Sequence, residues 1–197
     1  MAREYWRGGN MLYPVPAVMV SCGRKNEKPN LITVAWAGTV CSDPVMLSIS
    51  VRKERYSHTI IKETGEFAVN LVTEELVRAA DYCGVKSGRD IDKFTECQLT
   101  PIKSKTISAP SISESPLTLE CKVKQIIELG SHDMFLAEVT AVSVDDQYMD
   151  ENGKFHLNET KLCAYSHGEY FELGKKIGKF GYSVRKKKEK TEKEKTN

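Results

Sequence analysis

The residues best suited to hold an anion lie close together in the sequence. Ser48, Ser50 and Arg52 alternate along one face of an expected strand, and Ser57 and His58 open the helix expected next. Hydroxyl groups, a guanidinium group and the backbone N–H groups of a helix N-terminus are the donors that proteins use for phosphate. With Ser57 as the expected N-cap, this pattern predicts an anion site that suits a phosphate best.

Two expected strands and a turn must position these groups. Residues 31–36 are β-branched and aromatic, which favours a strand, and Pro44 closes the turn that follows. Residues 45–52 then alternate between apolar and polar side chains. The apolar set is expected to face the core, which leaves the hydroxyls and Arg52 on the opposite face.

The rest of the chain predicts more strands than helices. A second helix is expected from an N-cap at Thr73 to Gly84, and Asn152-Gly153 is typical of a hairpin turn. Other strands are expected at residues 17–22, 67–72, 117–129 and 134–144, the last two forming a hairpin joined at Gly130-Ser131-His132-Asp133. Many short strands with two or three helices predict a mainly β fold, a small and nearly closed Greek-key-like barrel.

Several short motifs, in this order, resemble the flavin reductase-like proteins with an FMN-binding split β-barrel, and the flavoredoxin branch most of all. They are Asn30-Leu31-Ile32-Thr33-Val34-Ala35-Trp36, Ser50-Val51-Arg52, Ser57-His58-Thr59, Ser87-Gly88-Arg89-Asp90-Ile91-Asp92-Lys93-Phe94, Gly130-Ser131-His132-Asp133 and Gly178-Lys179-Phe180-Gly181-Tyr182-Ser183. The resemblance spans roughly residues 5 to 185. It implies FMN as the cofactor and a homodimer with FMN near the subunit interface.

An FMN site needs charge compensation for the phosphate, polar partners for the pyrimidine edge and an apolar bed for the ring. The candidate cofactor-binding residues are Asn30, Thr33, Val34, Ala35, Trp36, Ser48, Ser50, Val51, Arg52, Tyr56, Ser57, His58, Cys83, Ser87 and Lys93. The phosphate candidates have plainer alternatives. Arg52 and Lys93 could be solvated surface charges, Ser57 only a helix cap, and His58 a helix N1 residue that faces water. Trp36 is equally explained as a core indole.

His132 is the candidate catalytic residue, because a histidine has no packing reason to lie in a hairpin loop. Related flavin reductases carry a histidine in a Gly-Asp-His motif near the open face of the flavin. Here the order is Ser131-His132-Asp133, which departs from that motif. The resemblance implies a role for His132 beside the nicotinamide or the electron acceptor.

Length and composition predict one domain over residues 1–184, followed by a basic disordered tail over residues 185–197. The tail holds seven of the 29 Lys and Arg and three of the 27 Asp and Glu, which leaves 22 basic and 24 acidic residues elsewhere. No apolar run approaches the ~20 residues that span a bilayer, and no signal-peptide core is seen, so a cytoplasmic location is expected. The six cysteines lack the spacing of metal ligands and are expected to be reduced thiols. Cys83 is expected to lie near the cofactor.

Two classes of function remain open. The first is an FMN-dependent oxidoreductase that takes hydride from NAD(P)H or, as an electron carrier, electrons from a redox protein such as ferredoxin; no Gly-x-Gly-x-x-Gly fingerprint predicts a resident Rossmann site. The second is a non-catalytic small β-barrel that binds nucleic acid or another ligand, although aromatic and basic residues are not interleaved along the strands as stacking platforms require. A pyridoxamine phosphate oxidase-like activity is a minor enzymatic alternative.

Overall fold

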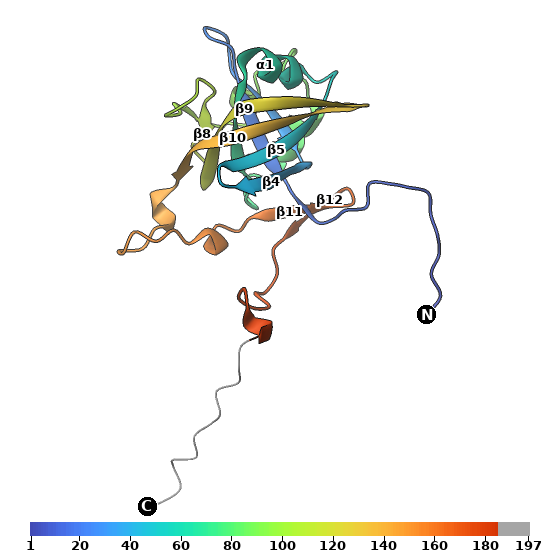
Figure 1. Ribbon diagram of the computed structural model, residues 1–197. Helices are drawn as coiled ribbons and strands as arrows, with labels where there is room; N and C mark the ends of the chain where they lie inside the picture. The colour runs from blue at the N-terminus through green and yellow to red at the C-terminus, as the bar shows by residue number, and fades with distance from the viewer. Residues whose placement is uncertain (185–197) are drawn as a thin grey trace, which may run out of the picture.

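The computed structural model describes residues 1–184, so the predicted basic tail lies outside the described residues. The N-terminal segment and the last described residues before position 185 extend away from a rounded body of strands (Figure 1). The strands are β1 Val15–Pro16, β2 Val18–Cys22, β3 Asn30–Val34, β4 Ala37–Ser42, β5 Val45–Arg52, β6 Glu66–Leu71, β7 Pro101–Ile102, β8 Ser111–Ile112, β9 Leu117–Leu129, β10 His132–Val144, β11 Cys163–Ser166 and β12 Glu169–Glu172. The helices are α1 Tyr56–Thr64, α2 Val77–Val85 and α3 Lys93–Glu96, with 3-10 turns at Asp146–Tyr148, Leu157–Glu159 and Tyr182–Val184. The predicted mainly β fold with a few helices is confirmed.

Seven strands form one antiparallel sheet in the order β3-β2-β6-β9-β10-β5-β4. The edge strands of this sheet, β3 and β4, are joined by Ala35 and Trp36 alone, so the sheet curls round until its two ends approach each other. The Ser50 N–H on β5 donates to the Trp36 carbonyl in this link at 2.9 Å, which extends the β4–β5 pairing. Strand β2 pairs with β3, the predicted β9–β10 hairpin forms, and β5 has the predicted bounds. A smaller sheet, β1-β11-β12, lies beside this barrel and pairs a segment from the N-terminal part of the chain with a hairpin from the C-terminal part (Figure 1).

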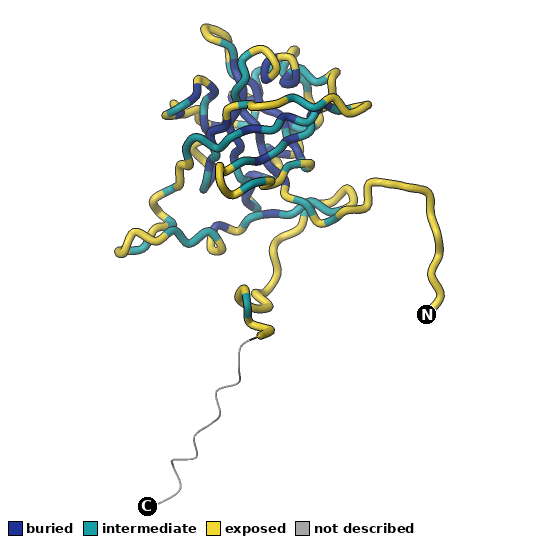
Figure 2. Tube along the Cα trace, in the orientation of Figure 1, coloured by how far each residue is buried: buried dark blue, intermediate teal, exposed yellow. Residues whose placement is uncertain are grey.

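Two buried clusters explain why β2 is buried on both faces. Inside the barrel, Val20 packs with fully buried residues such as Ile49, Phe67 and Phe135. Figure 2 shows the buried parts of the chain concentrated in the middle of the barrel. On the outer face of β2 and β3, Met19 packs in a second cluster with side chains of α2 and α3. The short helices are therefore fixed against β3, and they form a wall beside it.

The N-termini of the two longer helices differ from the predictions. The N-cap of α1 is Arg55, not Ser57, because the Ser57 side chain turns into the protein and accepts a hydrogen bond from Asn30 Nδ2 at 2.8 Å. The N-cap of α2 is Leu76, not Thr73, because Thr73 is held in a β-bridge to Leu162. Gly65 ends α1 in the left-handed conformation (φ 70°).

The predicted Asn152-Gly153 turn forms without two flanking strands. Gly153 adopts φ 76°, and its N–H donates to the Asp150 carbonyl at 2.9 Å. A bridge between Met149 and Phe155 flanks it, with the Asp150 N–H donating to the Lys154 carbonyl at 3.0 Å. Among residues 1–184, no helix combines the length and the apolar character that crossing a membrane requires.

Candidate functional site

Two adjoining cavities lie between the end of β3, the start of α1 and the C-terminal part of α2. We call the first the aromatic cavity, about 310 Å³, because Tyr13, Trp36, His132, Tyr165 and Tyr170 line it. We call the second the basic cavity, about 340 Å³, because four cationic side chains line it. These are Arg55, Lys86, Arg89 and Lys93. The two cavities share Ile32 and Arg55, so a ligand longer than either cavity can extend through both.

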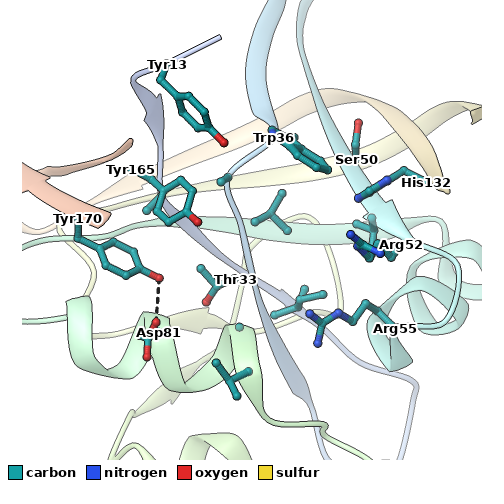
Figure 3. A pocket seen from close by; sticks show the side chains of 17 residues that line it. Tyr13, Thr33, Trp36, Ser50, Arg52, Arg55, Asp81, His132, Tyr165 and Tyr170 are labelled. Atoms are coloured by element: carbon teal, nitrogen blue, oxygen red, sulfur yellow. Dashed lines mark hydrogen bonds between the residues drawn. The ribbon is translucent and has the colours of Figure 1, made fainter. Parts of the chain in front are cut away.

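One side of the aromatic cavity is formed by β5, β10 and the link between β3 and β4. Trp36 is 38% exposed, and its ring meets that of His132 edge-on with 4.6 Å between the centroids. His132 is the first residue of β10 and pairs with Arg52 of β5, so it lies in a strand rather than in the predicted loop. Figure 3 shows Trp36, Ser50 and His132 together on this side.

The charge state of His132 follows from its surroundings. Partial burial lowers the pKa of the imidazole, and the nearby Arg52 guanidinium lowers it further. The ring nitrogen Nδ1 lies 2.8 Å from Ser131 Oγ, which fixes the ring orientation. His132 is therefore neutral near pH 7 and acts there as a hydrogen-bonding group rather than as a cation.

Three tyrosines form the opposite side of the aromatic cavity (Figure 3). The ring centroids of Tyr13 and Tyr165 are 6.2 Å apart, and those of Tyr165 and Tyr170 are 5.4 Å apart, both edge-on. Tyr170 donates to Asp81 of α2 at 3.4 Å, and burial together with the Asp81 charge raises the pKa of Tyr170 to about 12. The phenol stays protonated, so this side presents flat rings and a hydrogen-bonding edge.

The basic cavity lies beside the first turn of α1, where the helix dipole favours an anion. Ser57 and Ser87 add hydroxyl groups to its cationic lining, and Glu54 is a carboxylate on its wall. Asn30, which is buried, crosses from β3 to Ser57 and packs against Gly88. A cavity with these cations and hydroxyls fits a phosphate group.

Lys93 is buried, and its ammonium group has a structural role. Nζ donates to the carbonyls of Leu31 on β3 and Cys83 on α2, both at 2.7 Å. Burial lowers the pKa of the ammonium group. The side chain therefore fixes α3 and the preceding loop against β3 while its charge stays at the wall of the basic cavity.

His58 turns away from both cavities. Its Nε2 lies 2.8 Å from Asp133 Oδ2, and both side chains are buried. Lys53 Nζ lies 3.2 Å from the other carboxylate oxygen. Burial alone would raise the pKa of Asp133, but His58 and Lys53 outweigh it and hold the pKa below its ordinary value. His58 thus connects α1 to β10 and does not reach the predicted anion site.

The structure brings most of the sequence-predicted residues together. The aromatic cavity is lined by Thr33, Val34, Ala35, Trp36, Ser50, Val51, Arg52 and the candidate catalytic His132. The basic cavity is lined by Asn30, Tyr56, Ser57, Ser87 and Lys93. Neither lining includes Ser48, His58 or Cys83. Arg52, predicted at the phosphate, instead lines the aromatic cavity, half-exposed and 3.6 Å from Glu54.

Sequence reasoning missed the side chains that contribute most charge and most aromatic surface. Arg55 lies one residue before the predicted set, and Arg89 lies within the Ser87-to-Phe94 motif but drew no prediction of its own. Tyr13 and Tyr170 come from opposite ends of the chain and meet only through the β1-β11-β12 sheet. No local sequence pattern predicts that Tyr13 and Tyr170 come together.

Known proteins resemble the chain along most of its length. The sequence profile of the flavin reductase like domain matches residues 10–174. An uncharacterised protein of Archaeoglobus fulgidus is 34% identical over 160 residues, which cover 81% of this chain and 88% of that protein.

Two solved structures share the fold. Flavoredoxin of Desulfovibrio vulgaris (Miyazaki F) has a TM-score of 0.86 and 30% identity, with 93% of this chain and 100% of flavoredoxin covered. A protein with a split barrel domain from Shewanella frigidimarina NCIMB 400 has a TM-score of 0.76 and 22% identity, covering 86% of each chain. The predicted split-barrel fold is thereby confirmed.

Proposed function

The chain belongs to the flavin reductase-like family, and on that basis we propose that it is an FMN-dependent oxidoreductase. The observation that carries the proposal is that the aromatic and basic cavities adjoin through Ile32 and Arg55. FMN has the same two parts, a flat ring system and a phosphate, joined by a short chain. The likeness to flavoredoxin supports a flavin as the ligand.

The residues present fit FMN. Arg55, Arg89, Ser57 and Ser87 would bind the phosphate, with the first turn of α1 beside them. The strand residues Thr33 to Trp36 would lie along the ring and offer backbone donors and acceptors to its polar edge. Bound FMN supplies hydride and electron transfer at its ring, and the protein's own contribution is alignment and exclusion of water.

The electron donor is NAD(P)H in the flavin reductase reading and a redox protein such as ferredoxin in the flavoredoxin reading. These two functions are distinguished by mixing the FMN-loaded protein anaerobically with NADH, NADPH or reduced ferredoxin. The measurement is the loss of flavin absorption as the flavin is reduced. Fast bleaching by a nicotinamide nucleotide supports a reductase, and bleaching by ferredoxin alone supports an electron carrier. A protein that takes up FMN but is reduced by none of the three contradicts the proposed oxidoreductase.

We also propose that the protein works as a homodimer in the cytoplasm. The resemblance to the family and the exposed side chains Tyr5, Trp6 and Phe180, on chain ends that extend from the barrel, support the dimer (Figure 2). The six free cysteines support a reducing compartment. Light scattering on the eluting protein tests the dimer, and a monomer at micromolar concentration would contradict it.

His132 gives the reaction an expected pH dependence. Because burial and Arg52 lower its pKa below the ordinary value of 6.5, the neutral imidazole persists below that pH. If the neutral ring orients the hydride donor or acceptor, the rate of flavin reduction stays constant from pH 8 to about pH 6.5 and falls only at lower pH. Stopped-flow rates across this range measure it, and His132→Asn should remove the acid limb while FMN still binds.

The tyrosine side of the aromatic cavity is expected to hold the reaction partner of the flavin. Tyr165→Ala removes the central ring of the three and should raise the KM for the donor or acceptor by about twofold to tenfold, since an aromatic contact contributes about 0.5–1.5 kcal/mol. Tyr148→Ala, a tyrosine outside both cavities, is the control. Equal KM values for the two variants would contradict this role.

Gly88 gives a test of the basic cavity that changes no charge. A Cβ at this position would lie 1.9 Å from Asn30 Oδ1, so Gly88→Ala must displace a buried side chain that holds Ser57. We expect FMN affinity to fall about tenfold, equivalent to about 1.4 kcal/mol. Gly174→Ala, with nothing within 4 Å of the added Cβ, is the control in the same titration. If Gly88→Ala binds FMN with unchanged affinity, FMN binding does not depend on the packing of Gly88 against Asn30.

A further inference from the structure

Two cysteine thiols are in contact behind the wall of the candidate site. Cys83 of α2 and Cys97, the C-cap of α3, have their sulfur atoms 3.8 Å apart. Cys83 is fully buried, whereas Cys97 is partly exposed. Neither thiol lines the cavities assigned to FMN, so the proposed function leaves this pair unexplained.

The backbone around the pair is held in place by Lys93. Its ammonium group donates to the Cys83 carbonyl at 2.7 Å, and its own carbonyl accepts from the Cys97 N–H at 3.1 Å. At the start of α3, the Asp92 side chain accepts from the Thr95 N–H at 3.2 Å. The two thiols are thus presented to each other by fixed segments, and a disulfide would bring the sulfur atoms from 3.8 Å to a bond of about 2.05 Å.

We propose that Cys83 and Cys97 are a two-electron redox site that closes to an intramolecular disulfide when the protein meets a peroxide. The Cys97 thiolate, which is partly exposed, attacks one oxygen of hydrogen peroxide, becomes a sulfenic acid and releases hydroxide. The Cys83 sulfur then attacks Cys97 Sγ, the S–S bond forms, and the sulfenic oxygen leaves as water. Two thiols lose two electrons and two protons, and one peroxide becomes two waters.

The chemistry of the thiols sets the conditions under which the site reacts. Burial raises the pKa of both, that of Cys83 to about 12. Because the thiolate is the nucleophile, oxidation should be slow at neutral pH and faster as the pH rises. The proposal does not depend on FMN, since the thiols and the oxidant suffice.

The test is disulfide mapping on the full-length protein as purified, with the flavin spectrum recorded in parallel. After reduction, treatment with hydrogen peroxide, alkylation and digestion, we expect one peptide pair linked through Cys83 and Cys97 and a mass lower by two hydrogen atoms. Closing a loop of about 15 residues should also raise Tm by roughly 6–12 °C.

Two variants separate this pair from general thiol oxidation. Cys97→Ala should abolish both the linked peptide and the Tm rise, and because its side chain is only partly buried it should fold. Cys41→Ala removes another partly exposed thiol, whose sulfur lies 3.4 Å from the Asp43 carbonyl, and should keep both. Oxidation of Cys97 to sulfinic acid without a link, or a disulfide that joins other cysteines, would overturn the proposal whether or not the protein binds FMN.

Discussion

Replacing Arg55 and Arg89 together by alanine is expected to weaken FMN binding by about 100-fold to 10,000-fold and to leave riboflavin binding nearly unchanged. A hydrogen bond to a charged group contributes about 1.5–3 kcal/mol, and the double variant removes two such partners of the phosphate. Riboflavin lacks the phosphate, so it gains nothing from the basic cavity. Isothermal titration of both ligands against each protein measures the difference.

The control is Arg78→Ala, which removes an exposed arginine of α2 outside both cavities. Its FMN affinity should equal that of the wild type. If the Arg55/Arg89 variant loses both ligands equally, its fold has changed rather than its phosphate site. If it loses neither, the basic cavity does not bind the phosphate.

Asp133→Ala is expected to lower the free energy of unfolding by about 3–5 kcal/mol and Tm by roughly 6–20 °C. The variant leaves His58 buried without the carboxylate 2.8 Å away and removes the partner of Lys53. Removing this buried carboxylate is costly because the buried His58 loses its hydrogen-bond partner and Lys53 loses its nearest carboxylate. Urea unfolding followed by circular dichroism measures the loss.

Asp150 provides a matched control for this loss. Its carboxylate also lies 2.9 Å from a histidine ring nitrogen, in His156, but both side chains are about one-third exposed. Water can replace the partner there, so Asp150→Ala should cost less than about 1 kcal/mol. Equal losses of unfolding free energy in Asp133→Ala and Asp150→Ala would show that burial of the Asp133 pair does not add to its contribution to stability.

The Asp133 contribution should also depend on pH in one direction. Since its pKa in the folded protein is below the ordinary value of 3.8, the carboxylate stabilises the fold at pH values above 3.8. That stabilisation is lost as the pH falls through the lower, folded-state pKa. The stability difference between wild type and Asp133→Ala should therefore stay constant from pH 8 to about pH 5 and shrink below about pH 4.

Most of the barrel could be predicted because its strands have one clear pattern. Residues 45–52 alternate, and Leu47, Ile49 and Val51 are buried while the residues between them are not. The β9–β10 hairpin follows from the same alternation on both sides of a short turn. Helix starts were harder, because Ser57 and Thr73 are capping residue types whose side chains or backbone are held by partners distant in the sequence.

The candidate site was predictable where its residues lie on one strand or in one motif. Residues 33–36 and 50–52 line the aromatic cavity, and Ser57 and Ser87 line the basic one, as the local patterns suggested. His58 does not line the basic cavity, and no local pattern indicates this, because its buried partner Asp133 lies 75 positions along the chain. The tyrosine side depends on pairing between the two ends of the chain, which periodicity cannot reveal.

The central claim is that the two adjoining cavities hold one FMN. The most direct test is to purify the protein, denature it and identify the released chromophore by mass spectrometry. The amount released is then compared with the amount of protein. The account predicts FMN at about one molecule per chain, either as purified or after incubation with FMN. A colourless protein that retains no FMN after such incubation would contradict it.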